Sequence, residues 1–196
     1  MSERKIVVYG FETSNNLKVR LALAYKRLPN EFRTIDPGDR TEIVRLSGQF
    51  LTPVLVDGGT VLFDSAAILR YLDANYPDTP KLYGADRTEQ WEIEEWERFG
   101  RGPLADPMMS LVHARAGGQE VGEAMRSAAA DRFAQTVRRI EERLAGREWL
   151  VGGGISAADI TCAAVLHRVR STAVLPWPAG CPRSERLSER IIALLQ

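Results

Sequence analysis

Residues 52–65 read TPVLVDGGTVLFDS and hold the densest set of structural signals in this chain. Pro53 stands at the head of an apolar run. Because proline cannot donate to a strand ladder, it marks a strand start, a sheet edge or a cis turn. The two glycines after Asp57 tolerate positive φ between short β-type runs, which predicts a hairpin. The acid and serine at 64 and 65 then mark the start of a helix.

The same acid–serine pair indicates a binding site. A serine at the cap of a helix offers a hydroxyl and free backbone N–H groups to an anion. The carboxylate of Asp64, next to it, is suited to a cationic amine. Asp64 and Ser65 are therefore candidates for holding the two ends of an amino-acid-like ligand.

The residues on either side of this stretch alternate between strand and helix patterns. They predict, in chain order, a buried strand at 6–9, a helix from Leu17 that ends before Pro29, a strand at 32–35, a weak helix at 40–46, the hairpin, and a helix at 65–76. The order β-α-β-α-β-β-α matches a thioredoxin-like domain over residues 1–76, in which the first strands are parallel and the hairpin is antiparallel. Alternation alone also fits other α/β folds.

The second half of the chain lacks strand signals. Two prolines in the segment 77–86 predict a linker, and the all-helical domain is expected over 87–196. Within it, Pro107 is expected to kink a helix, and a long helix is expected from Glu120 to Ala145. Ser156 and Asp159 have the spacing of a capping box at the start of a further helix, where they are a folding element rather than a chemical one.

Composition narrows the function classes. Lys plus Arg and Asp plus Glu both number 26 in 196 residues, so no overall charge attracts nucleic acid or an anionic membrane. The N-terminus does not read as a signal peptide and no apolar run approaches membrane length, which predicts a cytoplasmic protein. Its two cysteines, Cys162 and Cys181, are in no metal-site or disulfide pattern, and Cys181 would be reactive only if exposed. The four tryptophans are expected in the core, with the lining of the substrate pocket as the alternative.

The loop with Thr52-Pro53, the hairpin and the helix that starts at Asp64-Ser65 together resemble the glutathione site of the glutathione transferase family. The resemblance extends over most of the chain, because an all-helical second domain follows. It implies glutathione as a co-substrate, no metal, a small hydrophobic electrophile as the second substrate, and a homodimer in which the first domain of one subunit meets the second domain of the other.

A second resemblance concerns the turn that would activate the glutathione thiol. Residues 13–19, TSNNLKV, are similar to the Thr-Pro-Asn-Gly-x-Lys-Val pattern of fungal-type and related bacterial transferases. In that register Thr13 takes the position of the activating hydroxyl and Asn15 that of the family's asparagine. Ser14 replaces proline, so either Thr13 or Ser14 can be the donor to sulfur. Tyr9 is the alternative donor, as in transferases that activate the thiol with a tyrosine. A purely structural alternative is that Thr13, Ser14 and Asn15 only cap the helix that follows.

The same resemblance also assigns residues of this chain to the other parts of glutathione. It implies a cis peptide at Pro53, backbone contacts from Thr52 to the cysteinyl part, and Ser65 and Asp64 on the γ-glutamyl carboxylate and ammonium. Related sequences often carry a lysine for the glycyl carboxylate where this chain has Leu51. The alternatives for that role are Gln49, Arg40 and Arg45.

These observations predict a glutathione transferase that stabilises the glutathione thiolate and either conjugates it to an electrophile, in a detoxification role, or uses it to reduce a peroxide or disulfide. No cysteine lies near the activating turn, which disfavours a mixed disulfide between enzyme and glutathione. The alternative is a binding or regulatory protein of the stress-response type that keeps the fold without transferase activity. Leu51 and Ser14 favour that alternative, and the intact Asp64-Ser65 pair favours the enzyme.

Overall fold

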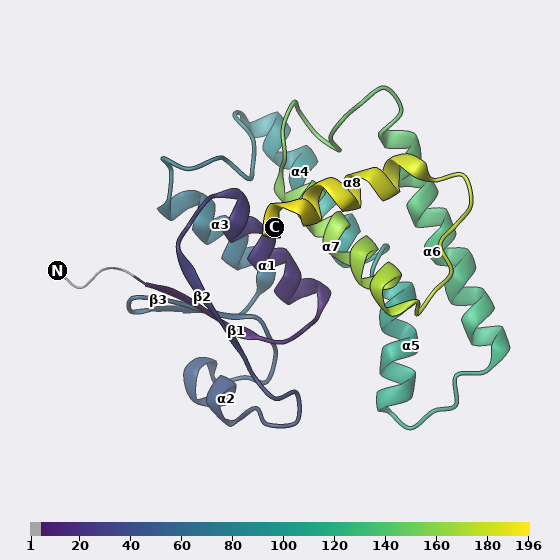
Figure 1. Cartoon of the computed structure of the whole chain (residues 1–196), viewed down its shortest axis with the longest axis horizontal. Coiled ribbons are helices and arrows are strands. Elements are labelled where there is room, and N and C mark those ends of the chain that lie inside the picture. The colour runs from purple at the N-terminus through teal and green to yellow at the C-terminus, as the bar shows by residue number, and fades with distance from the viewer. Residues whose placement is uncertain (1–4) are drawn as a thin grey trace. The chain divides into compact units, whose positions relative to one another are not determined.

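The computed structural model describes residues 5–196 (Figure 1), which divide into two compact units. The first unit runs to Tyr83 and includes the last residues, Leu194–Gln196. The second unit is Gly84–Ala193. The segment expected as a linker, residues 77–86, spans the boundary between them.

A four-stranded sheet forms the centre of the first unit. Its order is β2-β1-β3-β4, with β1 parallel to β2 and antiparallel to β3, and with β3 antiparallel to β4. The two-residue turn between β3 and β4 has Gly58 at φ 59°, so the predicted hairpin is confirmed. The strands are β1 (Ile6–Gly10), β2 (Asn30–Thr34), β3 (Val54–Asp57) and β4 (Thr60–Leu62).

Three helices cover the two faces of this sheet: α1 (Ser14–Tyr25), α2 (Thr41–Ser47) and α3 (Ser65–Asn75). Helices α1 and α3 pack on each other on one face, and α2 lies on the other (Figure 1). On the α2 face, Tyr9 and Val54 are buried with Ile43 of α2. Because side chains alternate along a strand, the neighbours Val8 and Leu55, both fully buried, face the other layer. The order β-α-β-α-β-β-α confirms the thioredoxin-like prediction.

Helix α1 ends earlier than its apolar stripe predicts. Arg27 has a left-handed φ of 54°, its N–H donates to the Ala24 carbonyl, and the Leu28 N–H donates to the Leu23 carbonyl. These two bonds form a Schellman motif that closes the helix at Tyr25. The position usually holds glycine, so nothing in the sequence marks this end.

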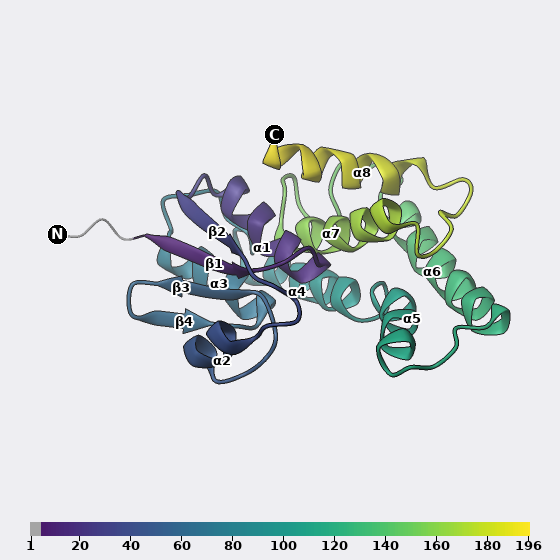
Figure 2. The same ribbon diagram turned by 60° about the horizontal axis from the view of Figure 1, so that its bottom comes forward.

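The second unit is all-helical, as predicted. Helix α7 is buried along most of its length and packs against both α4 and α8 (Figure 2). Its N-terminus has the predicted capping box of Ser156 and Asp159. No helix in residues 5–196 is long and apolar enough to cross a membrane. The helices are α4 (Arg87–Arg101), α5 (Asp106–Ala116), α6 (Glu123–Arg143), α7 (Ala157–Thr172) and α8 (Pro182–Ile192), followed by a 3-10 turn, Ala193–Leu195.

Two expectations for this unit are wrong, those for Pro107 and for the tryptophans. Pro107 does not kink a helix, because it lies in the first turn of α5, where its missing N–H would have no intrahelical partner. No tryptophan belongs to the buried core of the described residues, since Trp91 is 62% exposed and arginine guanidinium groups stack over Trp96 and Trp149. Cys181 was expected to react only if exposed; it is buried, and burial raises the pKa of its thiol above the usual value, so that condition is not met.

Candidate functional site

The turn between β1 and α1 is held by Thr13 and Asn16. Thr13 is the N-cap of α1, and its hydroxyl oxygen accepts a bond of 3.2 Å from the backbone N–H of Asn16. The side-chain amide of Asn16 donates a second bond, of 2.7 Å, to the same oxygen. Ser14, the first helical residue, is half-buried beside it. Capping therefore accounts for only one of the two bonds that Thr13 accepts.

The Asn16 side chain also joins this turn to the loop before β3. It is 1% exposed, and its amide nitrogen donates to the Thr52 hydroxyl at 3.0 Å. One side-chain amide thus fixes two hydroxyls that lie 39 positions apart in the sequence, at 13 and 52. Sequence reasoning missed Asn16, which stands where the similar pattern has glycine. The only sequence signal was its N3 position, three residues after the cap.

Gly10, at the end of β1, makes room for the Asn16 side chain. A Cβ atom at this position would lie 1.7 Å from the Asn16 side-chain oxygen. That oxygen is buried and accepts no hydrogen bond from any described residue. Any residue other than glycine at position 10 must therefore displace the amide that holds Thr13 and Thr52.

The hydrogen bonds at Thr13 determine what its hydroxyl can do. A hydroxyl has one proton to donate and two lone pairs that accept. Both N–H groups of Asn16 that point at Thr13 use the accepting side of the oxygen. The Thr13 proton is then left to donate to a further acceptor, and the two accepted bonds polarise the hydroxyl and strengthen it as a donor. Such a donor at a helix N-terminus favours an anionic partner.

The loop before β3 has the predicted cis peptide. The Thr52–Pro53 bond is cis, Pro53 is buried, and β3 begins at the next residue, Val54. Gln49 and Leu51 precede this peptide and were also predicted to lie at the glutathione site. Gln49 uses its amide within its own loop, where it donates to the Ser47 hydroxyl at 2.8 Å and to the Leu51 carbonyl at 2.9 Å, and it also accepts from the Leu51 N–H. The Leu51 side chain is 72% exposed.

The start of α3 lies next to the start of α1. Asp64, and not Ser65, is the N-cap of α3, because its carboxylate accepts from the Ala67 N–H at 2.8 Å. Ser65 is the first helical residue, and its hydroxyl donates to the Asn15 side-chain oxygen at 3.3 Å. The placement of the cap therefore corrects the sequence interpretation, in which the serine was the capping residue. Two helix N-termini and their polar side chains meet at this point, an arrangement that suits an anionic ligand.

Two other candidates from the sequence, Tyr9 and Arg45, are engaged away from the turn of Thr13. Tyr9 lies under α2 in the cluster with Ile43 and Val54, and its hydroxyl accepts from the Arg33 guanidinium at 2.9 Å. Its hydroxyl is therefore already engaged at β2 and not at the turn of Thr13. Arg45 is exposed on α2, with a guanidinium nitrogen 3.9 Å from the Glu42 carboxylate.

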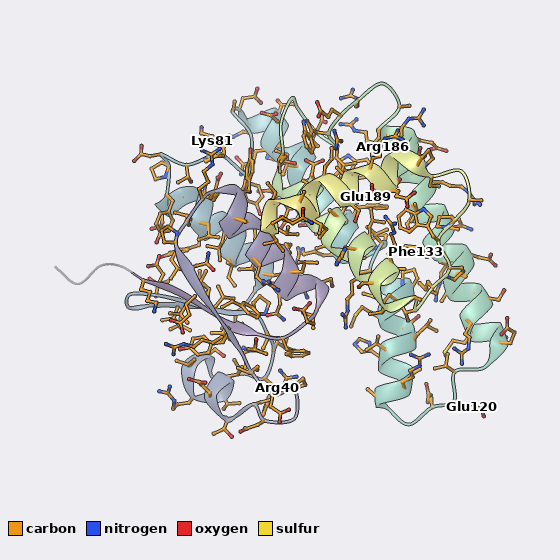
Figure 3. The ribbon with its side chains drawn as sticks, in the orientation of Figure 1. Arg40, Lys81, Glu120, Phe133, Arg186 and Glu189 are labelled. Carbon is orange, nitrogen blue, oxygen red and sulfur yellow. The ribbon has the colours of Figure 1, made fainter. Side chains whose placement is uncertain are left out.

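Arg40 has the surroundings of a ligand-binding residue. It is the residue before α2 (Figure 3), and its guanidinium lies over the ring of Phe11, 4.5 Å from the ring centre. One of its terminal nitrogens is buried and has no hydrogen-bond partner among the described residues. Phe11 is two residues before Thr13, so this cation lies beside the turn.

Comparisons with known proteins agree on one family. The model of the glutathione S-transferase N-terminal domain matches residues 8–80, and that of the C-terminal domain matches residues 113–190. A glutathione S-transferase of Triticum aestivum is 25% identical over 178 residues, which cover 85% of this chain and 79% of the wheat protein. A glutathione S-transferase-like protein of Fusarium is 29% identical over 142 residues, 67% of this chain and 65% of that protein.

A solved structure carries the same likeness. The glutathione S-transferase of Methylobacterium radiotolerans, in complex with glutathione sulfonate, is 26% identical and superposes with a TM-score of 0.81 over 96% of this chain and 91% of that one.

Proposed function

Because this chain belongs to the glutathione S-transferase family, we propose that it is a glutathione transferase, which binds glutathione, stabilises its thiolate and transfers it to a small hydrophobic electrophile. The observation that carries the proposal is the pair of bonds from the Asn16 amide to Thr13 and Thr52. They fix the activating turn against the loop that would hold the cysteinyl part of glutathione.

Glutathione binds in an extended form along the first unit. The backbone N–H and C=O of Thr52, next to the cis peptide, pair with the cysteinyl residue as a short strand would. Ser65 and the first N–H groups of α3 take the γ-glutamyl carboxylate, and the exposed carboxylate of Asp64 takes its ammonium. The bond from Ser65 to Asn15 links this end of the ligand to the activating turn.

The Thr13 hydroxyl donates to the glutathione sulfur. A hydrogen bond to the charged form of a group favours that form, so this donor lowers the thiol pKa from its free value of about 8.5. The N-terminus of α1 acts in the same direction. Ser14 is the second candidate, because its hydroxyl lies in the first turn of the same helix. We place Thr13 first because its two lone pairs are already occupied by N–H donors.

The thiolate then acts as the nucleophile. In conjugation, its electron pair forms a bond to an electrophilic carbon, and the leaving group departs with the electrons of the bond that breaks. With a disulfide or peroxide instead, the sulfur attacks a sulfur or oxygen atom, and glutathione is oxidised while the second substrate is reduced.

The glycyl carboxylate is held by Arg40. Of the three alternatives, Gln49 is engaged within its own loop and Arg45 is exposed beside Glu42. Arg40 has a buried guanidinium nitrogen with no partner among the described residues and lies over Phe11, near the turn. A guanidinium suits this role because it can bind a carboxylate through two parallel bonds.

We also propose that the protein is a homodimer. The first unit exposes four large apolar side chains in the loop before β3, in β4 and just after β4: Phe50, Leu51, Val61 and Phe63. Phe50 is 67% exposed and Phe63 is 47% exposed. A second copy of the chain would cover side chains of this size and remove the exposed edge strand β4 from solvent.

A test of the transferase proposal has two stages. Calorimetry with glutathione comes first, and absence of binding at millimolar glutathione would refute the proposal. The thiol pKa of bound glutathione is then followed by thiolate absorption in the wild type, Thr13→Val and Ser14→Ala. We expect the pKa to rise in Thr13→Val and to stay unchanged in Ser14→Ala. Binding with an unperturbed thiol pKa in all three proteins would favour the alternative function, a binding or regulatory protein, to which Leu51 and Ser14 point.

A further inference from the structure

The second unit has an open surface cavity of about 430 Å³ between the end of α6 and α8, and its charged side chains are exposed to solvent. Its wall includes Leu144 and Gly146, just beyond α6, and six charged side chains: Arg147, Glu148, Arg183, Arg186, Glu189 and Arg190. Figure 3 labels Arg186 and Glu189 on α8. None of the residues assigned to glutathione lines this cavity, so an activity at this place would be separate from the proposed transfer reaction.

The spacing along α8 explains why arginines gather here. Positions 183, 186 and 190 follow one another by three and four residues, so their side chains lie on one face of the helix. Arg147 faces the same cavity from the segment after α6. The wall therefore has four guanidinium groups against two carboxylates, an excess of two positive charges.

Internal ion pairs account for only part of this charge. Both carboxylates are already paired, Glu148 with Arg190 at 2.8 Å and Glu189 with Arg170 at 3.3 Å. The Arg183 guanidinium is 3.1 Å from Glu141. The side chains of Arg147 and Arg186, in contrast, form no hydrogen bond or ion pair with any described residue. The guanidiniums of Arg147 and Arg186 together carry two positive charges, the same as the excess positive charge of the wall.

The N-terminus of α8 is not available to a ligand. Glu141 accepts from the backbone N–H groups of Arg183 at 3.1 Å and Ser184 at 2.8 Å. Burial raises the pKa of Glu141, but these N–H donors, the Ser184 hydroxyl and the Arg183 charge outweigh burial and hold the pKa below its usual value. Glu141 is thus an ionised internal anion, and a second anion in the cavity must be held by the arginine side chains.

We propose that this cavity binds a small phosphate-bearing molecule through Arg147 and Arg186. Two guanidiniums match the roughly two negative charges of a phosphate monoester, and pyrophosphate offers the same phosphate oxygens with a higher charge. Arginine binds such oxygens through paired N–H donors. The volume lies within the range of small-molecule sites. Gly146 leaves space at the wall, because no atom comes within 4 Å of the position of its missing Cβ, and Leu144 gives the organic part an apolar contact.

The experiment uses the full chain with saturating glutathione present, so that the proposed glutathione site is occupied. Inorganic pyrophosphate, and then a sugar phosphate alongside the same sugar without phosphate, are titrated by calorimetry. The double variant Arg147→Gln/Arg186→Gln removes the two unpartnered cations. Arg115→Gln/Arg132→Gln is the matched control, because it removes two exposed arginines of the second unit that do not line the cavity.

We expect pyrophosphate to bind the wild type and the control equally, and the cavity variant at least tenfold more weakly. The sugar phosphate should bind and the plain sugar should not. No pyrophosphate binding to the wild type at millimolar concentration would overturn the proposal, and so would equal weakening in both variants, which indicates general charge attraction. Glutathione affinity, measured separately in each variant, should stay unchanged. A failure of the transferase proposal would therefore be detected separately from a failure of the phosphate-site proposal.

Discussion

The side-chain amide of Asn16 donates to the Thr13 hydroxyl at 2.7 Å, on the same oxygen that already accepts from the Asn16 backbone N–H. One residue thus occupies both lone pairs of the proposed activating hydroxyl. The hydroxyl can therefore act only as a donor toward a ligand, because its proton is the one bonding group left. In the proposed site Asn16 is a positioning residue: it orients the donor and does not touch the sulfur.

Asn16→Asp should reverse that orientation. The introduced carboxylate only accepts, so the Thr13 proton turns toward it and away from glutathione. A hydrogen bond to a charged group contributes about 1.5–3 kcal/mol, and we expect the thiol pKa of bound glutathione to rise by about 1–2 units. Thiolate absorption against pH measures this rise. Asn30→Asp, which adds the same charge at an exposed position of the first unit, is the control and should leave the pKa unchanged.

Combining Asn16→Asp with Thr13→Val tests whether Asn16 acts through Thr13. If it does, the double variant should show about the same thiol pKa as Thr13→Val alone, since the donor is already gone. Fully additive pKa rises would instead mean that Asn16 influences the sulfur directly, which would contradict its role as a positioning residue.

Gly10→Ala should damage the site without touching glutathione. The added Cβ would lie 1.7 Å from the Asn16 side-chain oxygen, so the amide must move away from Thr13 and Thr52. We expect a loss of about 1–3 kcal/mol in the free energy of unfolding, measured in urea, together with a raised thiol pKa. Gly59→Ala is the matched control, because no atom lies within 4 Å of its Cβ position. Equal stability of the two variants would refute the packing argument.

Arg40→Met should weaken glutathione binding through the glycyl carboxylate alone. Losing a charge-assisted bond costs about 1.5–3 kcal/mol, which corresponds to about a tenfold to hundredfold rise in the Kd for glutathione. γ-Glutamylcysteine lacks the glycine, so its Kd should be the same in Arg40→Met and the wild type. Arg45→Met should leave both Kd values unchanged. A parallel loss of affinity for both ligands would show that Arg40 supports the fold of the turn and not the carboxylate.

Phe50→Asp should shift a dimer to a monomer. The side chain is 67% exposed in the single chain, so the change costs the isolated subunit little, while a charge buried between subunits is strongly unfavourable. Light scattering after size-exclusion chromatography gives the mass directly. Phe50→Tyr keeps the ring and should stay dimeric. A wild-type mass equal to one chain of 21.8 kDa would refute the dimer.

Local signals in the sequence predicted local structure well. The hairpin at Gly58 and the capping box of Ser156 and Asp159 each depend on residues close together in the chain, and the structure has both. The cis peptide at Pro53 was instead implied by the family resemblance, and the structure has it too. The end of α1 was missed because a Schellman motif normally needs glycine, and here Arg27 adopts the left-handed conformation.

The network inside the site could not be predicted in the same way. Asn16 reaches Thr52 over 36 residues and Ser65 reaches Asn15 over 50. Such bonds exist only once the fold brings α1, the loop before β3 and α3 together. The family resemblance led to Thr13 and Asn15, and the acid–serine pair at a predicted helix start led to Ser65. Asn16 occupies a glycine position of the family pattern, so the resemblance assigned it no role.

We expect the buried carboxylate of Asp159 to make the stability of the second unit depend on pH. Asp159 is fully buried, and burial raises its pKa to about 6, against the opposing effect of the N–H of Leu150 and the N–H and hydroxyl of Ser156, which donate to the carboxylate. The unfolded value is about 3.8, so between these two pH values the folded chain binds the proton more tightly than the unfolded chain. Stability from this group is therefore complete below about pH 4 and lost as the pH rises to about 6.

Asp159→Asn isolates this effect because an amide does not titrate. A shift of about two pKa units corresponds to about 3 kcal/mol. The free energy of unfolding of the wild type, minus that of Asp159→Asn, should thus decrease by up to that amount between pH 4 and pH 7, as measured by urea unfolding followed through tryptophan fluorescence. If this difference instead increases with pH, the three donors stabilise the carboxylate by more than burial penalises it, and the folded pKa lies below 3.8.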